Sequence, residues 1–120
     1  MNRRKELGDK GEALVAKYLK KHKYKITDKN FSCKFGEIDI IGENKEYILF
    51  VEVKTRMVGQ EISPMLSVGY TKQQKIIKTA TLYMKMNNIE KQPRFDVAEV
   101  FMNDKGKAEI NYIENAFWKR

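Results

Sequence analysis

The spacing of apolar residues along the chain predicts two helices and five strands. Apolar residues recur at three- and four-residue intervals over roughly residues 5–22 and again after Thr71, which is the period of an amphipathic helix. Between and after these segments, apolar residues alternate with polar ones or run together, as is typical of strands. The expected strands are residues 24–28 (resuming near Phe31), 36–41, 47–54, 94–101 and 108–113. The pattern therefore predicts the order α-β-β-β-α-β-β in one domain over residues 1–120, without repeats or a linker.

The second helix carries a start signal and a stop signal. Thr71 is followed three residues later by Gln74, which has the form of a capping box, so we expect the helix to begin at Thr71. Asn87-Asn88 is expected to end it. The segment 57–70 before the helix contains scattered glycine and proline and is predicted to be a loop.

Charged residues interrupt the two central strands, which flank a turn at residues 42–46. Because side chains alternate faces along a strand, Glu52 and Lys54 point the same way, and a suitable register would bring Asp39 beside Glu52. Two carboxylates with an ammonium two residues along make a site for a hard divalent cation. The pattern Asp…Glu-x-Lys therefore suggests metal-dependent phosphodiester cleavage. The alternative is an ordinary solvated sheet face on which Glu52 and Lys54 form an ion pair.

The overall charge favours an anionic partner. Lys plus Arg number 24 and Asp plus Glu number 16, which gives a net charge of +8. Nucleic acid is the commonest partner of such a protein, although a solvated basic surface without a ligand has the same charge. Nothing in the chain resembles a recognition helix or a zinc finger, so we expect binding directed by shape. The candidate phosphate contacts are Arg3, Arg4, Lys5, Arg56, Lys72, Lys75 and Lys78.

Cysteine content and hydropathy bound the cellular setting. Cys33 is the single cysteine, which excludes an intramolecular disulfide framework and a thiolate zinc cluster and fits a reducing compartment. We expect Cys33 to be a partly buried thiol rather than a nucleophile. The longest purely apolar run, residues 47–51, is far too short to span a bilayer. These features lead us to expect a soluble, cytoplasmic protein without a membrane partner.

The element order, together with Asp39 in the second strand and Glu52-x-Lys54 in the third, resembles the restriction-endonuclease-like superfamily. The resemblance implies an α/β fold with an αβββαβ core, in which helices flank a central mixed sheet, and a PD-(D/E)xK site. Ile38 stands where that motif has proline. More narrowly, the chain resembles the YraN family of small bacterial proteins. The resemblance is carried by Gly11-Glu12, residues 33–41, residues 50–56, Lys72-Gln73 and residues 94–97.

The resemblance to the YraN family implies an arrangement close to that of Holliday-junction resolvases, which place a further glutamate on the first helix. Glu12 matches that position. Asp39, Glu52 and the backbone carbonyl of Val53 would hold Mg²⁺ or Mn²⁺, and Lys54 would orient the attacking water or stabilise developing charge. Gln73 and Lys72 stand at a helix N-terminus, where they would contact a water or a phosphate oxygen; simple helix capping is the alternative. Asp96 is expected to be structural, paired with a nearby base.

Three functions remain open from the sequence. The first is a Mg²⁺- or Mn²⁺-dependent endonuclease acting on DNA, with branched or damaged DNA as candidate substrates. The second is a non-catalytic nucleic-acid-binding module that keeps the nuclease fold, and the third is an accessory protein whose charged site serves a protein partner. A junction resolvase needs a two-fold dimer to make paired cuts, so a homodimer is a further expectation of the first reading.

Overall fold

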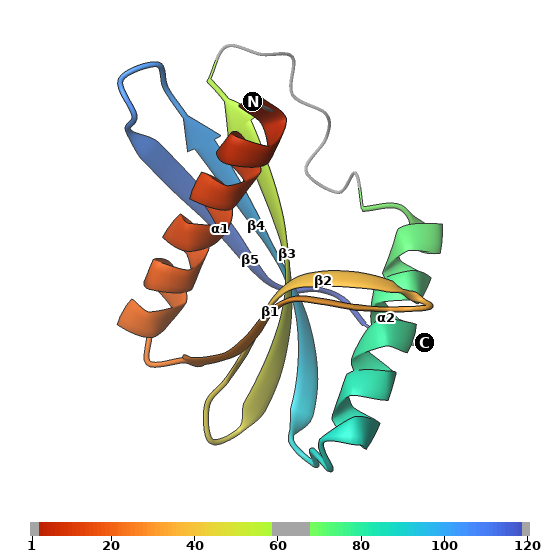
Figure 1. The fold of residues 1–120 in the computed structure, drawn as a ribbon. Coiled ribbons are helices and arrows are strands. Elements are labelled where there is room, and N and C mark those ends of the chain that lie inside the picture. The colour runs from red at the N-terminus through yellow and green to blue at the C-terminus, as the bar shows by residue number, and fades with distance from the viewer. Residues whose placement is uncertain (1–2, 59–67, 119–120) are drawn as a thin grey trace.

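The computed structural model of the protein describes residues 3–58 and 68–118. Within these ranges it contains two helices and five strands in the predicted order (Figure 1). The elements are α1 (Arg3–Lys21), β1 (Lys25–Cys33), β2 (Gly36–Glu43), β3 (Tyr47–Met57), α2 (Tyr70–Met86), β4 (Gln92–Met102) and β5 (Ala108–Phe117). The predicted α/β fold is confirmed.

The five strands form one mixed sheet in the order β1-β2-β3-β4-β5. β3 and β4 are parallel, because α2 carries the chain back across the sheet between them, and the other neighbouring pairs are antiparallel. α1 and α2 lie on opposite faces of the sheet (Figure 1). Each face has its own apolar core, one built around Val15, Leu19 and Val51 under α1, the other around Phe50, Ile77 and Tyr83 under α2.

Each of the five strands extends beyond its predicted range, and β1 and β5 do so together with a shift in register. β1 runs without a break, and a bulge between Ile26 and Asp28 shifts its register against β2. A bulge of this kind hides the two-residue period, since two residues then oppose one. β5 continues past residue 113 to Phe117, with a register shift between Phe95 and Val97 of its partner strand.

The predicted capping box at Thr71 is wrong. The helix begins one residue earlier, and Gly69 is its N-cap, with extended backbone and no side-chain capping hydrogen bond. The Gly69 carbonyl accepts the N–H of Gln73 at 2.9 Å, so the backbone closes the first turn without help from a threonine hydroxyl. Asn87 is the C-cap, as the sequence predicts.

α1 approaches β3 at a glycine. A Cβ built on Gly11 would lie 1.8 Å from Oγ1 of Thr55 and 2.9 Å from its Cβ, distances that no real Cβ adopts. Only glycine lets the helix come this close to the strand. The contact fixes the height of the next residue, Glu12, above the sheet.

Asp96 is structural, as predicted. Its fully buried carboxylate accepts hydrogen bonds from Nε and Nη2 of Arg94 (2.9–3.2 Å), from the Tyr112 hydroxyl at 2.6 Å and from the backbone N–H of Asn115 at 2.8 Å. The guanidinium of Arg94 also lies over the rings of Tyr24 and Tyr47. This buried ion pair joins β4 to β5. Asp96 and Arg94 compensate each other's charge, so Asp96 has a structural role.

Neither α1 nor α2, the helices of the described ranges, is long and apolar enough to cross a membrane.

Candidate active site

The pairing of β2 with β3 ends where the charged residues begin. The last paired residues are Ile40 and Val51. One residue further, Oδ2 of Asp39 accepts a hydrogen bond from the backbone N–H of Val53 at 2.8 Å. This side-chain hydrogen bond replaces the backbone hydrogen bond that would continue the β2–β3 pairing. This places Asp39 beside Glu52, which lies between Val51 and Val53. The register that the sequence required is present.

The two carboxyl groups of Asp39 and Glu52 are pressed together in a largely buried setting. The pKa of Asp39 is raised from 3.8 to about 8, first by burial and then by the hydrogen bond and the charge of Glu52. Burial also opposes ionisation of Glu52, but its hydrogen bond with Asp39 and the ammonium of Lys72 bring its pKa below the usual value. Two carboxylates this close in a low dielectric cannot both stay ionised without compensation. The pair therefore holds either a shared proton or a cation.

Two lysines approach the pair. Nζ of Lys72 lies 2.7 Å from Oε2 of Glu52, and the Glu52 side chain is 8% exposed while that of Lys72 is 48% exposed. This contact lies off the direction of a hydrogen bond, and Oε2 has no hydrogen-bond partner among the described residues. The pKa of Lys54 is lowered, mainly by burial and also by the positive charge of Lys72. The negative charge of Glu52 raises it, but not enough to offset these two effects. The site thus gathers two acids and two ammonium groups.

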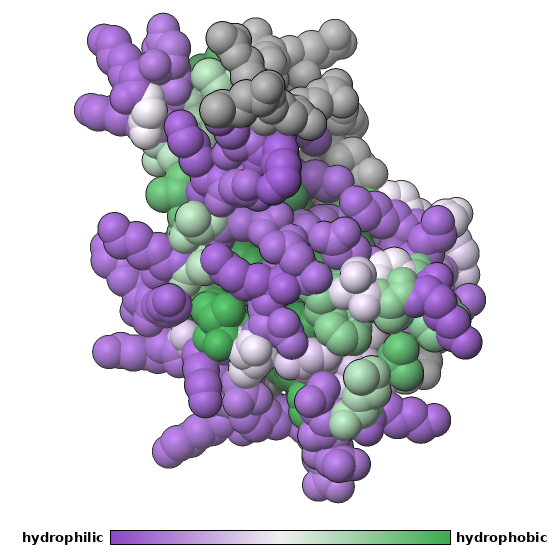
Figure 2. All heavy atoms as spheres, in the orientation of Figure 1, coloured by the Kyte–Doolittle hydropathy of each residue, from purple (hydrophilic) through white to green (hydrophobic). Residues whose placement is uncertain are grey.

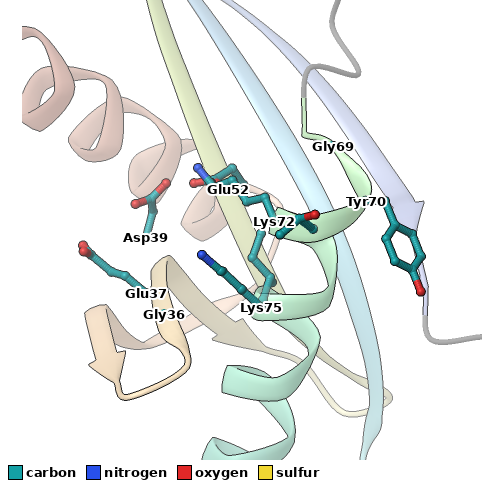
Figure 3. A pocket seen from close by; sticks show the side chains of 10 residues that line it. Gly36, Glu37, Asp39, Glu52, Gly69, Tyr70, Lys72 and Lys75 are labelled. Carbon is teal, nitrogen blue, oxygen red and sulfur yellow. The ribbon is translucent and has the colours of Figure 1, made fainter.

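The site opens to solvent through a hollow of about 640 Å³ between β2, β3 and the first turns of α2. Figure 3 shows the carboxylates of Glu37, Asp39 and Glu52 on the strand side and Lys72 and Lys75 reaching toward them from α2. Tyr70 points away from the carboxylates (Figure 3). The lining residues are Gly36, Glu37, Asp39, Glu52, Gly69, Tyr70, Thr71, Lys72, Lys75 and Ile76. The hollow is large enough for a phosphate group beside the carboxylate pair.

Comparison with known proteins places this sequence in a family. The model of the uncharacterised protein family UPF0102 matches residues 11–100. The chain belongs to the UPF0102 family. It is 46% identical over 117 residues to a UPF0102 protein of Caldanaerobacter subterraneus subsp. tengcongensis, covering 95% of this chain and 96% of the relative. A UPF0102 protein of Thermodesulfovibrio yellowstonii is 48% identical over 113 residues (94% and 96%), and one of Clostridium acetobutylicum is 44% identical over 115 residues (94% and 94%).

UPF0102 is the YraN family, so the resemblance drawn from the sequence is confirmed. The matched range contains every residue of the pocket and most of the predicted phosphate contacts. Arg3 and Arg4 precede it, and their side chains lie outside the described residues. Their predicted contact with nucleic acid stays a prediction.

Glu12 of this UPF0102 protein lies close enough to the carboxylate pair to act on it electrostatically. Its pKa is raised by burial, lowered by a hydrogen bond with Asn30, and raised further by Asp9 and Glu37. Its charge in turn contributes to the raised pKa of Asp39. Glu12 does not line the pocket, so its effect on the pair is electrostatic.

Two further predicted site residues, Gln73 and Arg56, do not line the pocket. Nε2 of Gln73 donates to the carbonyl of Val68 at 2.8 Å, so in this structure the amide is used to hold the entry to α2. Its predicted role toward a water or phosphate stays a prediction. Arg56 is half-buried two residues beyond Lys54, and its Nε has no hydrogen-bond partner among the described residues.

Sequence reasoning missed Glu99, a buried carboxylate next to the site. Glu99 is 4% exposed and lies directly opposite Lys54 in the parallel β3–β4 pairing, where paired side chains share a face. It accepts a hydrogen bond from Nδ2 of Asn111 at 3.1 Å. Its signal in the sequence is a lone acid in the apolar run from Val97 to Phe101.

The donor set of the UPF0102 pocket fits a hard divalent cation. No group of three or more His, Cys, Asp or Glu side chains in residues 3–58 and 68–118 is arranged around one point. Mg²⁺ does not need such a cage, because it is usually held by one or two carboxylates with waters and substrate phosphates completing the octahedron. Asp39 and Glu52 supply the two carboxylates, and Oε2 of Glu52 is ion-paired with Lys72 but accepts no hydrogen bond from the described residues. The carbonyl of Val53 faces the same edge of β3 as its N–H, toward Asp39.

Asp39→Asn is expected to change how stability depends on pH in metal-free protein. Because the pKa of Asp39 is about 8 in the fold against 3.8 for a free side chain, the folded state binds more protons, and stability falls as pH rises from about 4 to about 8. The amide removes this cost. In urea unfolding with EDTA, the variant should gain at least about 1.4 kcal/mol over wild type between pH 4.5 and pH 8.5, the worth of one pKa unit. If the unfolding free energies of wild type and Asp39→Asn changed with pH in the same way, ionising Asp39 would carry no such cost in the folded state.

Proposed function

We propose that this UPF0102 protein is a metal-dependent endonuclease that hydrolyses phosphodiester bonds in DNA. The observation that carries the proposal is the Asp39–Glu52 pair, in which Glu52 is buried and Asp39 half-buried; the pair lines a pocket with Lys72 and interacts electrostatically with Lys54. Buried like charges are costly, and a fold keeps them where a cation or a proton is to be bound. The net charge of +8 supports an anionic polymer as the substrate.

Asp39, Glu52 and the carbonyl of Val53 would hold Mg²⁺ or Mn²⁺. When bound, the ion would offset charge on the scissile phosphate and make a water molecule more acidic. Each carboxylate must be ionised to bind the cation, so the raised pKa of Asp39 makes the proton a competitor of the metal. Metal-dependent activity is therefore expected to rise as pH increases from 6 toward 8.

The lysines of the pocket have distinct tasks in this proposal. Lys54 comes from the same strand face as Glu52 and would orient the attacking water or stabilise charge that develops on the phosphate. Lys72 would leave Glu52 for a substrate phosphate once the cation neutralises the carboxylate. Lys75, which is exposed and lines the pocket, would bind the adjoining phosphate. Glu12 would raise the pKa of Asp39 through its negative charge.

One observation favours a second candidate function, a nucleic-acid-binding module without catalysis. The ion pair between Lys72 and Glu52 at 2.7 Å already compensates one carboxylate charge without a metal. A protein that had given up the cation would keep such a pair and its basic surface. The two candidates differ in a single measurable property, metal-dependent strand scission.

The proposal is tested by incubating the purified protein with labelled duplex, flap, four-way-junction and single-stranded DNA in Mg²⁺, in Mn²⁺ and in EDTA. We expect cleavage with either metal on at least one DNA form and none in EDTA. Paired cuts in the four-way junction would additionally indicate a two-fold dimer. Binding to DNA with no scission in either metal would overturn the nuclease and favour the binding module.

Lys54→Ala is expected to lower the cleavage rate by about 10²- to 10³-fold, the usual loss when one preorganised charge-stabilising group is removed. Binding should change little, because other lysines carry the phosphate contacts. Lys45→Ala is the matched control, since Lys45 is exposed in the turn between β2 and β3. Rates are measured at saturating DNA in Mn²⁺. Equal rates for the two variants would remove Lys54 from the site.

A further inference from the structure

A row of lysines leads along α2 away from the carboxylate pair. Lys72, Lys75, Lys78 and Lys85 are spaced by three, three and seven residues, so the row winds gradually around the helix, by about 140° in all. All four are exposed. At 1.5 Å per residue the row is about 20 Å long, enough to follow several phosphates of one strand.

Apolar surface lies between the outer lysines of this row. A second hollow of about 500 Å³ on α2 is lined by Phe35, Ile77, Lys78, Leu82 and Lys85, among others. Nζ of Lys34 lies 5.2 Å from the centroid of the Phe35 ring. Figure 2 shows apolar and weakly polar atoms among hydrophilic ones on the right of the view, where α2 and the tip of the β1–β2 hairpin lie. The surface offers a ring and aliphatic side chains framed by ammonium groups.

The turn between β1 and β2 joins this hollow to the candidate active site. Gly36 lines the pocket with the carboxylates, and its neighbour Phe35 lines the second hollow. The turn rests on α2, since a Cβ on Gly36 would be in ordinary contact with Cβ of Lys75 at 3.6 Å and Oγ1 of Thr79 at 3.5 Å. A strand held at Lys72 and Lys75 could therefore continue along the helix past Phe35.

We infer that this surface, defined by Phe35, Lys78, Leu82 and Lys85 and called here the α2 track, binds an unpaired DNA strand next to the scissile phosphate. The inference rests on the proposed function and names its substrate class: DNA with a single-stranded segment on one side of the cut. Bases of a duplex are stacked on one another and show a protein only their edges, whereas an unpaired base can lie on an aromatic ring. Lysines alternating with an aromatic ring and aliphatic side chains are the combination that single-strand grooves use.

The test measures binding without catalysis. Fluorescence anisotropy in EDTA compares a labelled 12-nucleotide oligo-dT with a 12-base-pair duplex over a range of salt concentrations. Wild type is expected to bind the single strand more tightly. Lys78→Ala/Lys85→Ala should weaken that binding at least tenfold and reduce the slope of log K against log salt by about 1.4, since each phosphate contact on a single strand contributes about 0.7.

Phe35→Ala separates stacking from charge. It should weaken oligo-dT binding about tenfold while leaving the salt slope and duplex binding unchanged. Lys17→Ala/Lys20→Ala on α1 is the matched control, because both lysines are exposed on the opposite face of the sheet and should leave affinity and slope near wild type. Circular dichroism checks that each variant is folded.

Duplex binding as tight as single-strand binding, or an unchanged salt slope in Lys78→Ala/Lys85→Ala, would overturn the α2 track. Tighter binding of oligo-rU than of oligo-dT would overturn DNA as its ligand. Because no arm depends on cleavage, a protein that binds along the track but never cuts would contradict the nuclease and leave the track standing. A protein that cuts DNA but fails these binding tests would support the nuclease and overturn the α2 track.

Discussion

Glu52→Gln is expected to reduce metal-dependent DNA cleavage by more than about 100-fold. Glutamine keeps the shape of the side chain, so β3 and its core contacts should be retained. The change removes one of two anionic oxygen donors from a site whose other donors are Asp39 and a backbone carbonyl. It also removes the negative charge of Glu52, which raises the pKa of Asp39 together with burial and the hydrogen bond between the two carboxyl groups. That pKa should therefore fall toward its ordinary value of 3.8 in the variant.

Cleavage rates in Mn²⁺ measure the first effect, and ¹³C chemical shifts of the Asp39 carboxyl during a pH titration measure the second. Glu46→Gln is the matched control, because Glu46 is exposed in the turn before β3 and should leave both readings at the wild-type value. Wild-type cleavage by Glu52→Gln would show that any scission arises elsewhere. An unmoved pKa would mean that Asp39 and Glu52 are not coupled.

Gly11→Ala is expected to lower the free energy of unfolding by about 1–3 kcal/mol, the usual cost of forcing a methyl group into a well-packed contact. The added Cβ would fall 1.8 Å from Oγ1 of Thr55 and 2.9 Å from its Cβ. The Cβ of Thr55 belongs to the frame of β3 and cannot swing aside, so α1 itself must lift. Glu12 would be carried away from Asp39, and cleavage should fall with stability.

Gly8→Ala is an internal control on the same helix. A Cβ on Gly8 meets nothing within 4 Å, so this change should stabilise α1 by about 0.5–1 kcal/mol through helix propensity alone. Urea unfolding of the two variants gives the comparison. Gains in stability from both substitutions would show that α1 does not pack on β3 as closely as described.

The arrangement of the central strands could be predicted from the sequence because alternation along a strand is rigid. Residues 36–41 and 47–54 flank a short turn, which predicts a hairpin, and a slip of one residue would turn their apolar side chains to the wrong faces. The observed register pairs Ile40 with Val51. The same register sets Asp39 beside Glu52. The acidic pair therefore followed from local pattern.

What the sequence could not predict depends on contacts between elements. The ion pair of Lys72 with Glu52 requires knowing how α2 is rotated over the sheet, and an exposed lysine in a first helical turn carries no sign of it. The predicted start of α2 is wrong because the Thr-x-x-Gln pattern at Thr71 is not used as a cap, and Gly69 caps the helix through its backbone. The position of Glu99 next to the site could not be predicted either, because it depends on the parallel pairing of β3 with β4 that sets Glu99 opposite Lys54.

The central claim is that Asp39 and Glu52 together bind a divalent cation, and counting bound Mn²⁺ tests it most directly. Electron paramagnetic resonance of free Mn²⁺ is followed during titration of wild type, Asp39→Asn and Glu46→Gln at pH 8.5, where the pair is largely ionised. The account predicts one ion per chain for wild type and Glu46→Gln, and at least tenfold weaker binding for Asp39→Asn. Equal binding by wild type and Asp39→Asn, or no binding by any of the three, would contradict it.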